Sequence, residues 1–385
     1  MSEVYLDYNA GAPVRPQVAK AVLEALEERI GNPSSIHGAG HRAKIILEKS
    51  RRSVASLLGA SPDAICFTSG GTESNNMALL GAAALRRGGH LIVSAIEHAS
   101  VLQTAQQLES RGYRVTRVRP DAEGWIPPED LLSQVRDDTL LVSLMHSNHE
   151  VGTLQSVQAV AEGLKGRGIL LHCDAVQSAG KVAIEVESLG ADLVSISAHK
   201  LGAPAGTGAL WIRQGVSLAP LLLGGNQEMN RRAGTPALAL LAGFGVAAEI
   251  SREELPIEAA RLKTLRDRFE TDLLDAFPDA RIHGRTRARL PGTCHVAIPG
   301  IRGEDLVMAL DLDGIAVSTG SACSTGTVRP SHVLQAMGCP PEEIQSSLRA
   351  SLGYRTTPTE TTRFLETLLG VVRGSARTPA AKGRE

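Results

Sequence analysis

Short apolar runs alternate with helical patterns through the first half of the chain. Apolar residues recur at helical spacing over 17–29 and 41–58. The β-branched and apolar runs that follow predict strands at 64–68, 90–96, 114–118, 140–145, 169–172 and 192–196. Strands that alternate with helices favour a largely parallel sheet with right-handed crossovers. The pattern therefore predicts an α/β fold.

The composition shifts near residue 251, where 251–268 has the pattern of a long charged helix. Beyond it we expect strands at 281–283, 294–298 and 315–318, and helices at 304–313, 331–337 and 341–351. These elements predict a large domain over 16–255 and a smaller α+β domain formed by 1–15 and 256–373. The tail 374–385 has no apolar face and is predicted to be disordered.

Overall charge excludes some partners. The 385 residues contain 40 Lys and Arg against 41 Asp and Glu, so no basic field favours nucleic acid or an anionic membrane.

The longest apolar stretch, 237–248, is too short to span a bilayer, and no secretory signal is visible, so we expect a cytoplasmic protein. The five cysteines are scattered without a CxxC pair, which argues against a disulfide framework and against a metal site.

Polar and ionisable residues follow five of the predicted strands. In open α/β sheets, ligands bind outside the carboxyl ends of the strands. The segments concerned begin at Ser69, Glu97, His146, Cys173 and Ala198. We therefore expect one site to collect all five.

Residues 69–72, Ser-Gly-Gly-Thr, stand between a predicted strand and a predicted helix. The first N–H groups of such a helix can hold an anion, although an ordinary helix cap with a tight turn explains the same residues. The stretch lacks the lysine of a nucleotide-binding P-loop.

Lys200 follows one strand end, and Asp174 ends the preceding strand. A single lysine is usually a surface charge. Pyridoxal phosphate, however, needs a lysine that binds it covalently, an acid that keeps its pyridine nitrogen protonated, and a phosphate cradle. The sequence offers all three.

Three further side chains have both a functional and an ordinary interpretation. His98 can stack on a planar ring and move protons, or it is a satisfied polar residue at a strand end. Cys323 lies in 318–327, a Ser/Thr/Gly-rich stretch without charge, and is either a nucleophile on a flexible loop or a bystander thiol. Arg349, in a helical pattern, either pairs with a substrate carboxylate or is a solvated charge.

Together these segments resemble the NifS/IscS-type cysteine desulfurases of the class V aminotransferases. The resemblance extends from Tyr5 to about residue 370. It is carried by YLDYNAGAP, GNPSSIHGAG, FTSGGTESNN, EHASVL, HSNHEVGTLQ, HCDAVQSAGK, SAHKLGAPAGTGALW, RRAGTPA, GSACSTGTVRPSHVL and SLRASLG. It implies the fold type I architecture of pyridoxal-phosphate-dependent transferases, with a mainly parallel large domain and a smaller α+β domain.

The resemblance also implies which residues surround the cofactor. These are Gly71, Thr72, His98, His149, Asp174, Gln177, Ser197, His199, Lys200 and Thr235. Gly71, Thr72, Ser197 and His199 would hold the phosphate, and Thr235 would reach the phosphate in a neighbouring subunit, which implies a homodimer.

At the ring, the resemblance implies that Lys200 binds the cofactor and His98 stacks on it. Asp174 would pair with the pyridinium, and Gln177 would contact the phenolic oxygen. The family usually has Asn where this chain has His149. Imidazole can donate there too, but its charge near neutral pH would shift the pH optimum.

For the reaction, the resemblance implies that Arg349, aided by Asn148, binds the carboxylate of L-cysteine. Lys200 would remove the α-proton, and Cys323 would attack the sulfur, which leaves a persulfide and L-alanine. The partner would be a sulfur-acceptor protein such as an iron–sulfur scaffold or a thiolation enzyme, and Cys323 could transiently ligate a transferred cluster. The alternatives are an aminotransferase or selenocysteine lyase on the same fold, or an inactive structural partner.

Overall fold

A large mixed sheet organises the protein. The computed structural model describes residues 3–28, 31–86, 88–320 and 330–377. In this part of the chain, seven strands have the order β2-β8-β7-β6-β5-β3-β4. Their bounds are β2 Ile65–Thr68, β3 His90–Ser94, β4 Arg114–Val118, β5 Thr139–Ser143, β6 Leu170–Asp174, β7 Leu193–Ser197 and β8 Gly208–Ile212. β8 runs antiparallel to β2 and β7, and the remaining pairs are parallel. The predicted α/β class is confirmed.

Helices cover both faces of this sheet. Successive residues of a strand point to opposite faces, so the apolar side chains of each buried strand need a cover on both sides. In β3, Ile92 belongs to the same core as residues of α1 (Pro16–Glu27), α2 (Gly38–Leu57), α6 (Val157–Leu164) and α7 (Val186–Leu189). Leu91 and Val93 belong to another buried cluster with residues of α3 (Gly71–Ala83) and α4 (Ala99–Ser110). Short helices complete the layer at α5 (Pro128–Leu132), η1 (Pro62–Ala64), η2 (Ala198–Lys200) and η3 (Gln227–Asn230).

A second core is built from both ends of the chain. β9 (Arg281–Ile282), β10 (Thr293–Ala297) and β12 (Ser347–Ser351) form an antiparallel sheet, and β1 (Val4–Tyr5) pairs with β11 (Ile315–Ala316). The helices here are α9 (Gly303–Leu312), α10 (His332–Ala336), α11 (Pro341–Gln345) and α12 (Pro358–Arg377). Phe269 and Phe364 pack in this core together with Val4 and Leu6.

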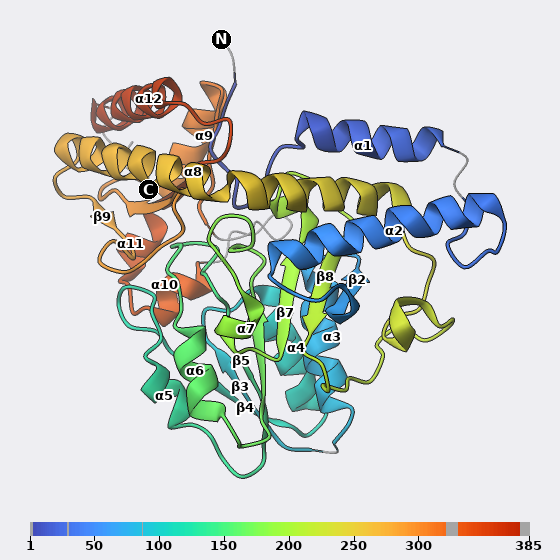
Figure 1. The fold of residues 1–385 in the computed structure, drawn as a ribbon. Helices are drawn as coiled ribbons and strands as arrows, with labels where there is room; N and C mark the ends of the chain where they lie inside the picture. The colour runs from blue at the N-terminus through green and yellow to red at the C-terminus, as the bar shows by residue number, and fades with distance from the viewer. Residues whose placement is uncertain (1–2, 29–30, 87, 321–329, 378–385) are drawn as a thin grey trace, which may run out of the picture.

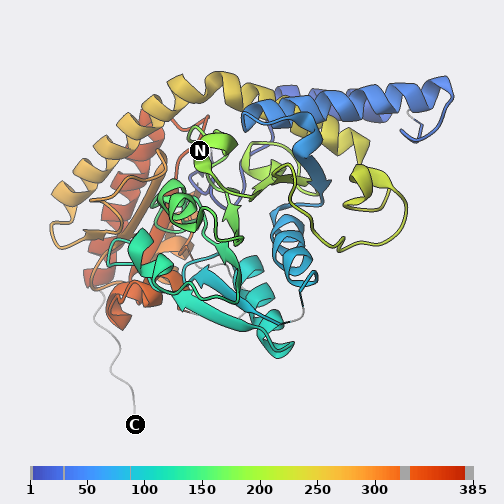
Figure 2. The same ribbon diagram turned by 60° about the horizontal axis from the view of Figure 1, so that its bottom comes forward.

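One long helix connects the two cores. α8 (Leu238–Ala276) joins the apolar stretch and the charged stretch that the sequence pattern separates, and Pro256 lies inside it. Leu241 and Phe244 belong to the core beneath the large sheet, and Leu262 and Phe269 belong to the second core. In Figures 1 and 2 the C-terminal half of α8 lies beside the orange and red segments. The division at 255/256 stays a prediction, and it falls within this helix.

Two expectations about the C-terminal part are wrong. The helix predicted over 341–351 ends at Gln345, and Ser347–Ser351 is strand β12. All five residues of that strand are buried and face β10, which a helical repeat could not achieve. The predicted disordered tail also begins too early, since α12 continues to Arg377. No helix in the described ranges is long and apolar enough to cross a membrane.

Candidate active site

A cavity of about 900 Å³ lies where the carboxyl ends of the strands face the second core. The ends of β2, β3, β6 and β7 contribute Ser69, His98, Asp174 and Ser197. The opposite wall comes from residues 7–10, α9, 317–320 and Arg349 of β12. The predicted convergence of strand-end residues is therefore found in the structure.

Lys200 presents its amine to this cavity from the short helix after β7. Its Nζ donates to the backbone oxygens of Asn9 at 2.5 Å and Ala10 at 2.7 Å. Burial, and then the Arg349 guanidinium, lower the pKa of Lys200 from 10.5 to about 8. A substantial fraction of this amine is therefore unprotonated near neutral pH.

Asp174 is a fixed acceptor at the end of β6. Its Oδ2 accepts a hydrogen bond from Asn75 Nδ2 at 2.7 Å, and its Oδ1 accepts one from the backbone N–H of Val176 at 3.0 Å. The same Asn75 amide donates to Ser100 Oγ at 2.8 Å. These bonds orient the carboxylate toward the cavity, as a partner for a ring N–H requires.

The start of α3 forms the anion-binding end of the cavity. Gly70, Gly71 and Thr72 line it, and the first N–H groups of a 13-residue helix point there. A Cβ on Gly71 would approach Val176 Cγ2 to 2.7 Å, so this close packing requires glycine. Ser197 Oγ and His199 Nδ1 lie 2.8 Å apart beside it. Burial, and then Lys200, lower the pKa of His199 to about 4, so its ring is neutral.

Arg349 is the cation on the opposite wall. It extends from β12 and is 4% exposed. One terminal nitrogen donates to Asp7 Oδ1 at 2.6 Å, and the other donates to the backbone oxygen of His149 at 2.9 Å. Its Nε is buried, and no described residue pairs with it. The guanidinium is thus held in place by a carboxylate from the start of the chain.

The two histidines face each other. The rings of His98 and His149 meet edge to face, with centroids 5.7 Å apart. Burial lowers the pKa of His98, and the charge of Lys200 lowers it further. Burial, and then His98, hold the pKa of His149 well below 6.5. These effects favour a neutral imidazole. The structure therefore argues against the charge on His149 near neutral pH that the sequence analysis considered.

Gln177 takes part in a network behind the cavity wall. Its Nε2 donates to the backbone oxygen of Asn9 at 2.9 Å, and its Oε1 accepts from Lys181 Nζ at 3.0 Å. Lys181 also donates to Asn9 Oδ1 at 2.9 Å. Burial, and then Lys200, lower the pKa of Lys181 to about 7.

Two predicted residues do not line the cavity, and a third is not among the described residues. The Asn148 amide holds its own turn instead of facing the cavity, since Nδ2 donates to Ile96 O at 3.0 Å and Oδ1 accepts the N–H groups of Glu150 and Val151. The expected contact between Asn148 and substrate is therefore not supported. Thr235 is exposed and lines a separate small pocket. Cys323 lies outside the described residues.

Sequence reasoning missed several site residues. It assigned no role to Asp7, Asn9 or Lys181, although the first two belong to the opening segment and the third ends HCDAVQSAGK. It also missed Asn75, which orients Asp174. The signal available for Asp7 and Asn9 was their position, because both are polar residues of the opening segment that follow an apolar pair directly.

Comparison with known proteins identifies the family. The model of the family described as aminotransferase class-V matches residues 4–364. The chain belongs to the class-V aminotransferase family. Among relatives within this family, cysteine desulfurase IscS of Dictyoglomus turgidum is 43% identical over 96% of this chain and 94% of its own length. Cysteine desulfurase IscS 1 of Archaeoglobus fulgidus is 42% identical over 96% of both chains.

Solved structures of class-V aminotransferase relatives agree. A NifS-like protein superposes with a TM-score of 0.91 at 38% identity, over 97% of this chain and 100% of its own. SspA in complex with cysteine superposes with a TM-score of 0.81 at 34% identity, over 91% of this chain and 99% of its own. The predicted family and architecture are confirmed.

The cavity fits pyridoxal phosphate, the cofactor of the class-V aminotransferase family. A helix N-terminus with a glycine cradle suits its phosphate, the oriented carboxylate of Asp174 suits its ring nitrogen, and Lys200 offers an amine of lowered pKa. In the wall of this cavity, His149 Nδ1 is buried and has no partner in the part of the chain that the structure describes. That orphaned nitrogen can serve a polar group of the ligand.

Proposed function

We propose that this protein is a cysteine desulfurase, which removes the sulfur of L-cysteine and leaves L-alanine. The observation that carries the proposal is the convergence of Lys200, Asp174 and Arg349 on one cavity. Gly320 also lines this cavity, and Cys323 follows it by three positions in the sequence. The similarity to cysteine desulfurases over nearly the whole chain supports it.

Pyridoxal phosphate, when bound, supplies an electron sink for the α-carbon of an amino acid. The α3 N-terminus with Thr72, Ser197 and His199 would hold its phosphate. Asp174 would hold its ring nitrogen, and His98 would lie against its ring. These assignments follow from the side chains that line the cavity.

Arg349 would bind the substrate carboxylate. Because its guanidinium already binds the carboxylate of Asp7 at 2.6 Å, the substrate has to replace or share that contact. A bidentate guanidinium–carboxylate pair also fixes the direction of the substrate. Asp7 therefore acts as the internal competitor that keeps Arg349 oriented when no substrate is bound.

Lys200 would move the α-proton. Its lowered pKa leaves part of the amine free to accept a proton at the α-carbon and to return one later. The backbone oxygens of Asn9 and Ala10 accept hydrogen bonds from Nζ and so keep the amine within the cavity.

Cys323 would take the sulfur. Cys323 follows Gly320, a residue that lines the cavity, by three positions in the sequence. The thiolate forms a new S–S bond as the substrate C–S bond breaks, and the electron pair left on carbon takes a proton. The resulting persulfide would pass to a sulfur-acceptor protein.

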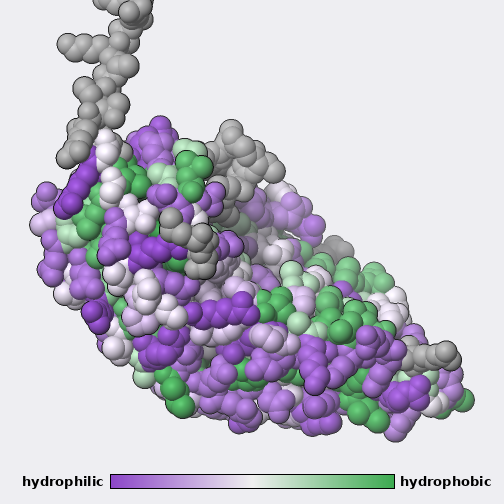
Figure 3. All heavy atoms as spheres, turned by 90° about the horizontal axis from the view of Figure 1, so that it is seen from above, coloured by the Kyte–Doolittle hydropathy of each residue, from purple (hydrophilic) through white to green (hydrophobic). Residues whose placement is uncertain are grey.

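The surface supports assembly into a homodimer. On α1, Leu23 is 55% exposed and Leu26 is 68% exposed, and Ile36 is fully exposed next to α2. Figure 3 shows apolar side chains gathered in the half of the upper face where α1 lies. Such a patch favours a second copy of the chain, in which the exposed Thr235 would approach the partner's cofactor.

The test is product analysis with L-cysteine. The parent should form equal amounts of alanine and, with a thiol reductant, sulfide. Cys323→Ser should lose sulfide formation on the order of a hundredfold or more while keeping bound cofactor. Cys66→Ala, a buried thiol in β2, is the matched control and should behave as the parent.

Mass spectrometry without reductant should find one added sulfur atom on the peptide that contains Cys323. Sulfide formation at the parental rate by Cys323→Ser would exclude that thiol as the nucleophile. In place of alanine, 3-mercaptopyruvate would favour an aminotransferase, and pyruvate with ammonia would favour an eliminating lyase.

A further inference from the structure

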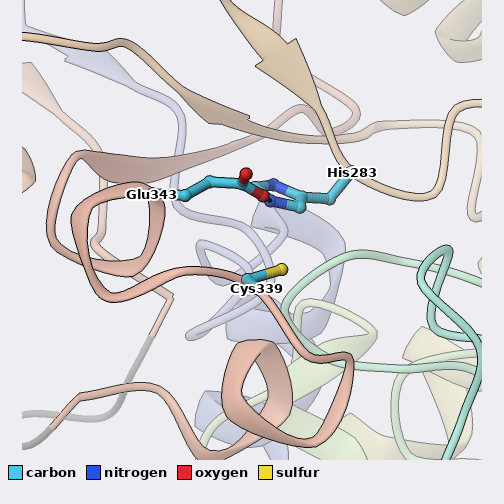
Figure 4. A group of neighbouring side chains, drawn as sticks. All are labelled: His283, Cys339 and Glu343. Atoms are coloured by element: carbon cyan, nitrogen blue, oxygen red, sulfur yellow. Dashed lines mark hydrogen bonds and ion pairs between the residues drawn. The ribbon is translucent and has the colours of Figure 1, made fainter.

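Three metal-ligating side chains meet away from the active site. His283 follows β9, Cys339 follows α10, and Glu343 lies in α11 (Figure 4). Their nitrogen, sulfur and oxygen atoms all lie within 4.8 Å of one another. His283 is fully buried and Cys339 is 9% exposed. None of the three lines the active-site cavity.

We propose that His283, Cys339 and Glu343 bind Zn²⁺, with water as the fourth ligand. Imidazole, thiolate and carboxylate are the ligand types that zinc accepts, at bond lengths of roughly 2.0–2.3 Å. The ligand atoms would have to contract around the ion by up to about 1 Å, which side-chain rotation can supply, while the 2.6 Å contact between His283 and Glu343 would open.

Each of two ligands is already oriented by an outer partner. Arg281 donates to Glu343 Oε2 at 3.1 Å, which leaves Oε1 for the ion. His283 Nδ1 lies 3.0 Å from His295 Nδ1, which leaves Nε2 for the ion. Such outer contacts orient metal ligands in known sites.

An orphaned nitrogen on His295 gives independent support. Without metal, a neutral His283 whose Nε2–H donates to the Glu343 carboxylate accepts at Nδ1 from His295 Nδ1–H. His295 Nε2 is then an acceptor, and it is buried without a partner among the described residues. A buried polar atom without a partner is unfavourable.

Zinc on His283 would reverse both tautomers. His283 Nδ1–H then donates to His295 Nδ1, so the proton of His295 moves to Nε2. A Cβ on Gly320 would lie 3.0 Å from this Nε2 and 3.3 Å from Glu150 Oε2, so a carboxyl oxygen lies on the same side of Gly320. In the metal-bound state His295 Nε2 becomes a donor, on the side of Gly320 where this carboxyl oxygen also lies.

Charge balance favours a divalent cation. Burial, and then Glu343, raise the pKa of Cys339 to about 12, so its thiol is protonated when no metal is present. Zinc replaces that proton, and one thiolate with one carboxylate neutralises its two charges. The ligands come from separate segments without a CxxC pair, which is why the sequence predicts no metal site.

The experiment uses the full chain with its cofactor, after treatment with a chelator. A Cys323→Ser background removes the thiol of the proposed active site. Titration with Co²⁺ should show one equivalent bound, with sulfur-to-cobalt absorbance and release of about one proton near neutral pH. Zn²⁺ should displace Co²⁺ and abolish the absorbance.

Variants assign the ligands. Cys339→Ser should remove the sulfur-to-cobalt absorbance, whereas Cys66→Ser, a second buried thiol, should keep it. Glu343→Gln should weaken Co²⁺ binding at least tenfold, and it decides the matter if Cys339→Ser fails to fold by circular dichroism. Absence of the absorbance at millimolar Co²⁺, its full persistence in Cys339→Ser, or an unchanged Co²⁺ affinity in Glu343→Gln would overturn the site. These readouts need no desulfurase activity, so they are independent of the proposed function.

Discussion

Lys200 is the amine on which the proposed chemistry depends, and its free fraction follows from its pKa. Burial, and then Arg349, lower that pKa from 10.5 to about 8. At about pH 7.5, a lysine of pKa 10.5 is about 0.1% unprotonated, whereas one of pKa about 8 is about 24% unprotonated. The site therefore raises the free-amine fraction roughly 240-fold.

Two neighbouring charges act on this pKa with opposite signs. Arg349 lowers it by repelling the ammonium, and Asp7 raises it by attraction. We therefore predict that Arg349→Gln raises the pKa of Lys200 and that Asp7→Asn lowers it. Well below the pKa, each unit changes the free-amine fraction about tenfold, so near neutral pH the first variant should react more slowly and the second faster.

The assay follows the reaction of cofactor-free enzyme with pyridoxal phosphate. Initial rates of the visible absorbance change, measured from about pH 6 to about pH 10, give the apparent pKa of the amine. Arg268→Gln removes an exposed guanidinium on α8 and is the matched control, for which no shift is expected. Circular dichroism checks that each variant is folded. The electrostatic reasoning is refuted if both site variants shift in the same direction or if neither shifts.

Three further predictions concern buried charges. Glu228→Ala should destabilise the protein by about 3–5 kcal/mol in urea unfolding, because it leaves the buried Arg51 without the carboxylate that both its terminal nitrogens contact; a loss below about 1 kcal/mol would contradict this. His149→Asn should leave the pH profile of the bound cofactor's absorbance unchanged from about pH 6 to about pH 8, since burial holds the pKa of His149 well below 6.5; a moved profile would show that the imidazole titrates. Burial, and then Asp174, raise the pKa of Glu97 from 4.5 to about 8, so between these pH values the folded state keeps a proton that the unfolded chain loses. The free energy of unfolding of the parent should therefore fall relative to that of Glu97→Gln as the pH rises from 4.5 to about 8. Parallel curves of unfolding free energy against pH would count against this prediction.

The sequence predicted what depends on local pattern. Strand ends followed by polar residues placed Asp174, Ser197 and Lys200 on one edge of the sheet, because the carboxyl ends of parallel strands coincide. It failed at Arg349, since a five-residue strand buried on both faces has no alternation to distinguish it from a helical turn. It also separated the halves of α8, because one helix packs against two cores and changes its composition between them.

Asn9 shows why the rest of the site could not be read from local pattern. Its backbone oxygen accepts from Lys200 Nζ at 2.5 Å and from Gln177 Nε2 at 2.9 Å. Its Oδ1 accepts from Lys181 at 2.9 Å, and its Nδ2 donates to Thr293 Oγ1 at 3.0 Å. One residue of the opening segment thus positions the Lys200 amine, the Gln177 amide and a strand of the second sheet. These contacts exist only after the start of the chain has packed between the two cores, so the environment of Lys200 depends on tertiary structure.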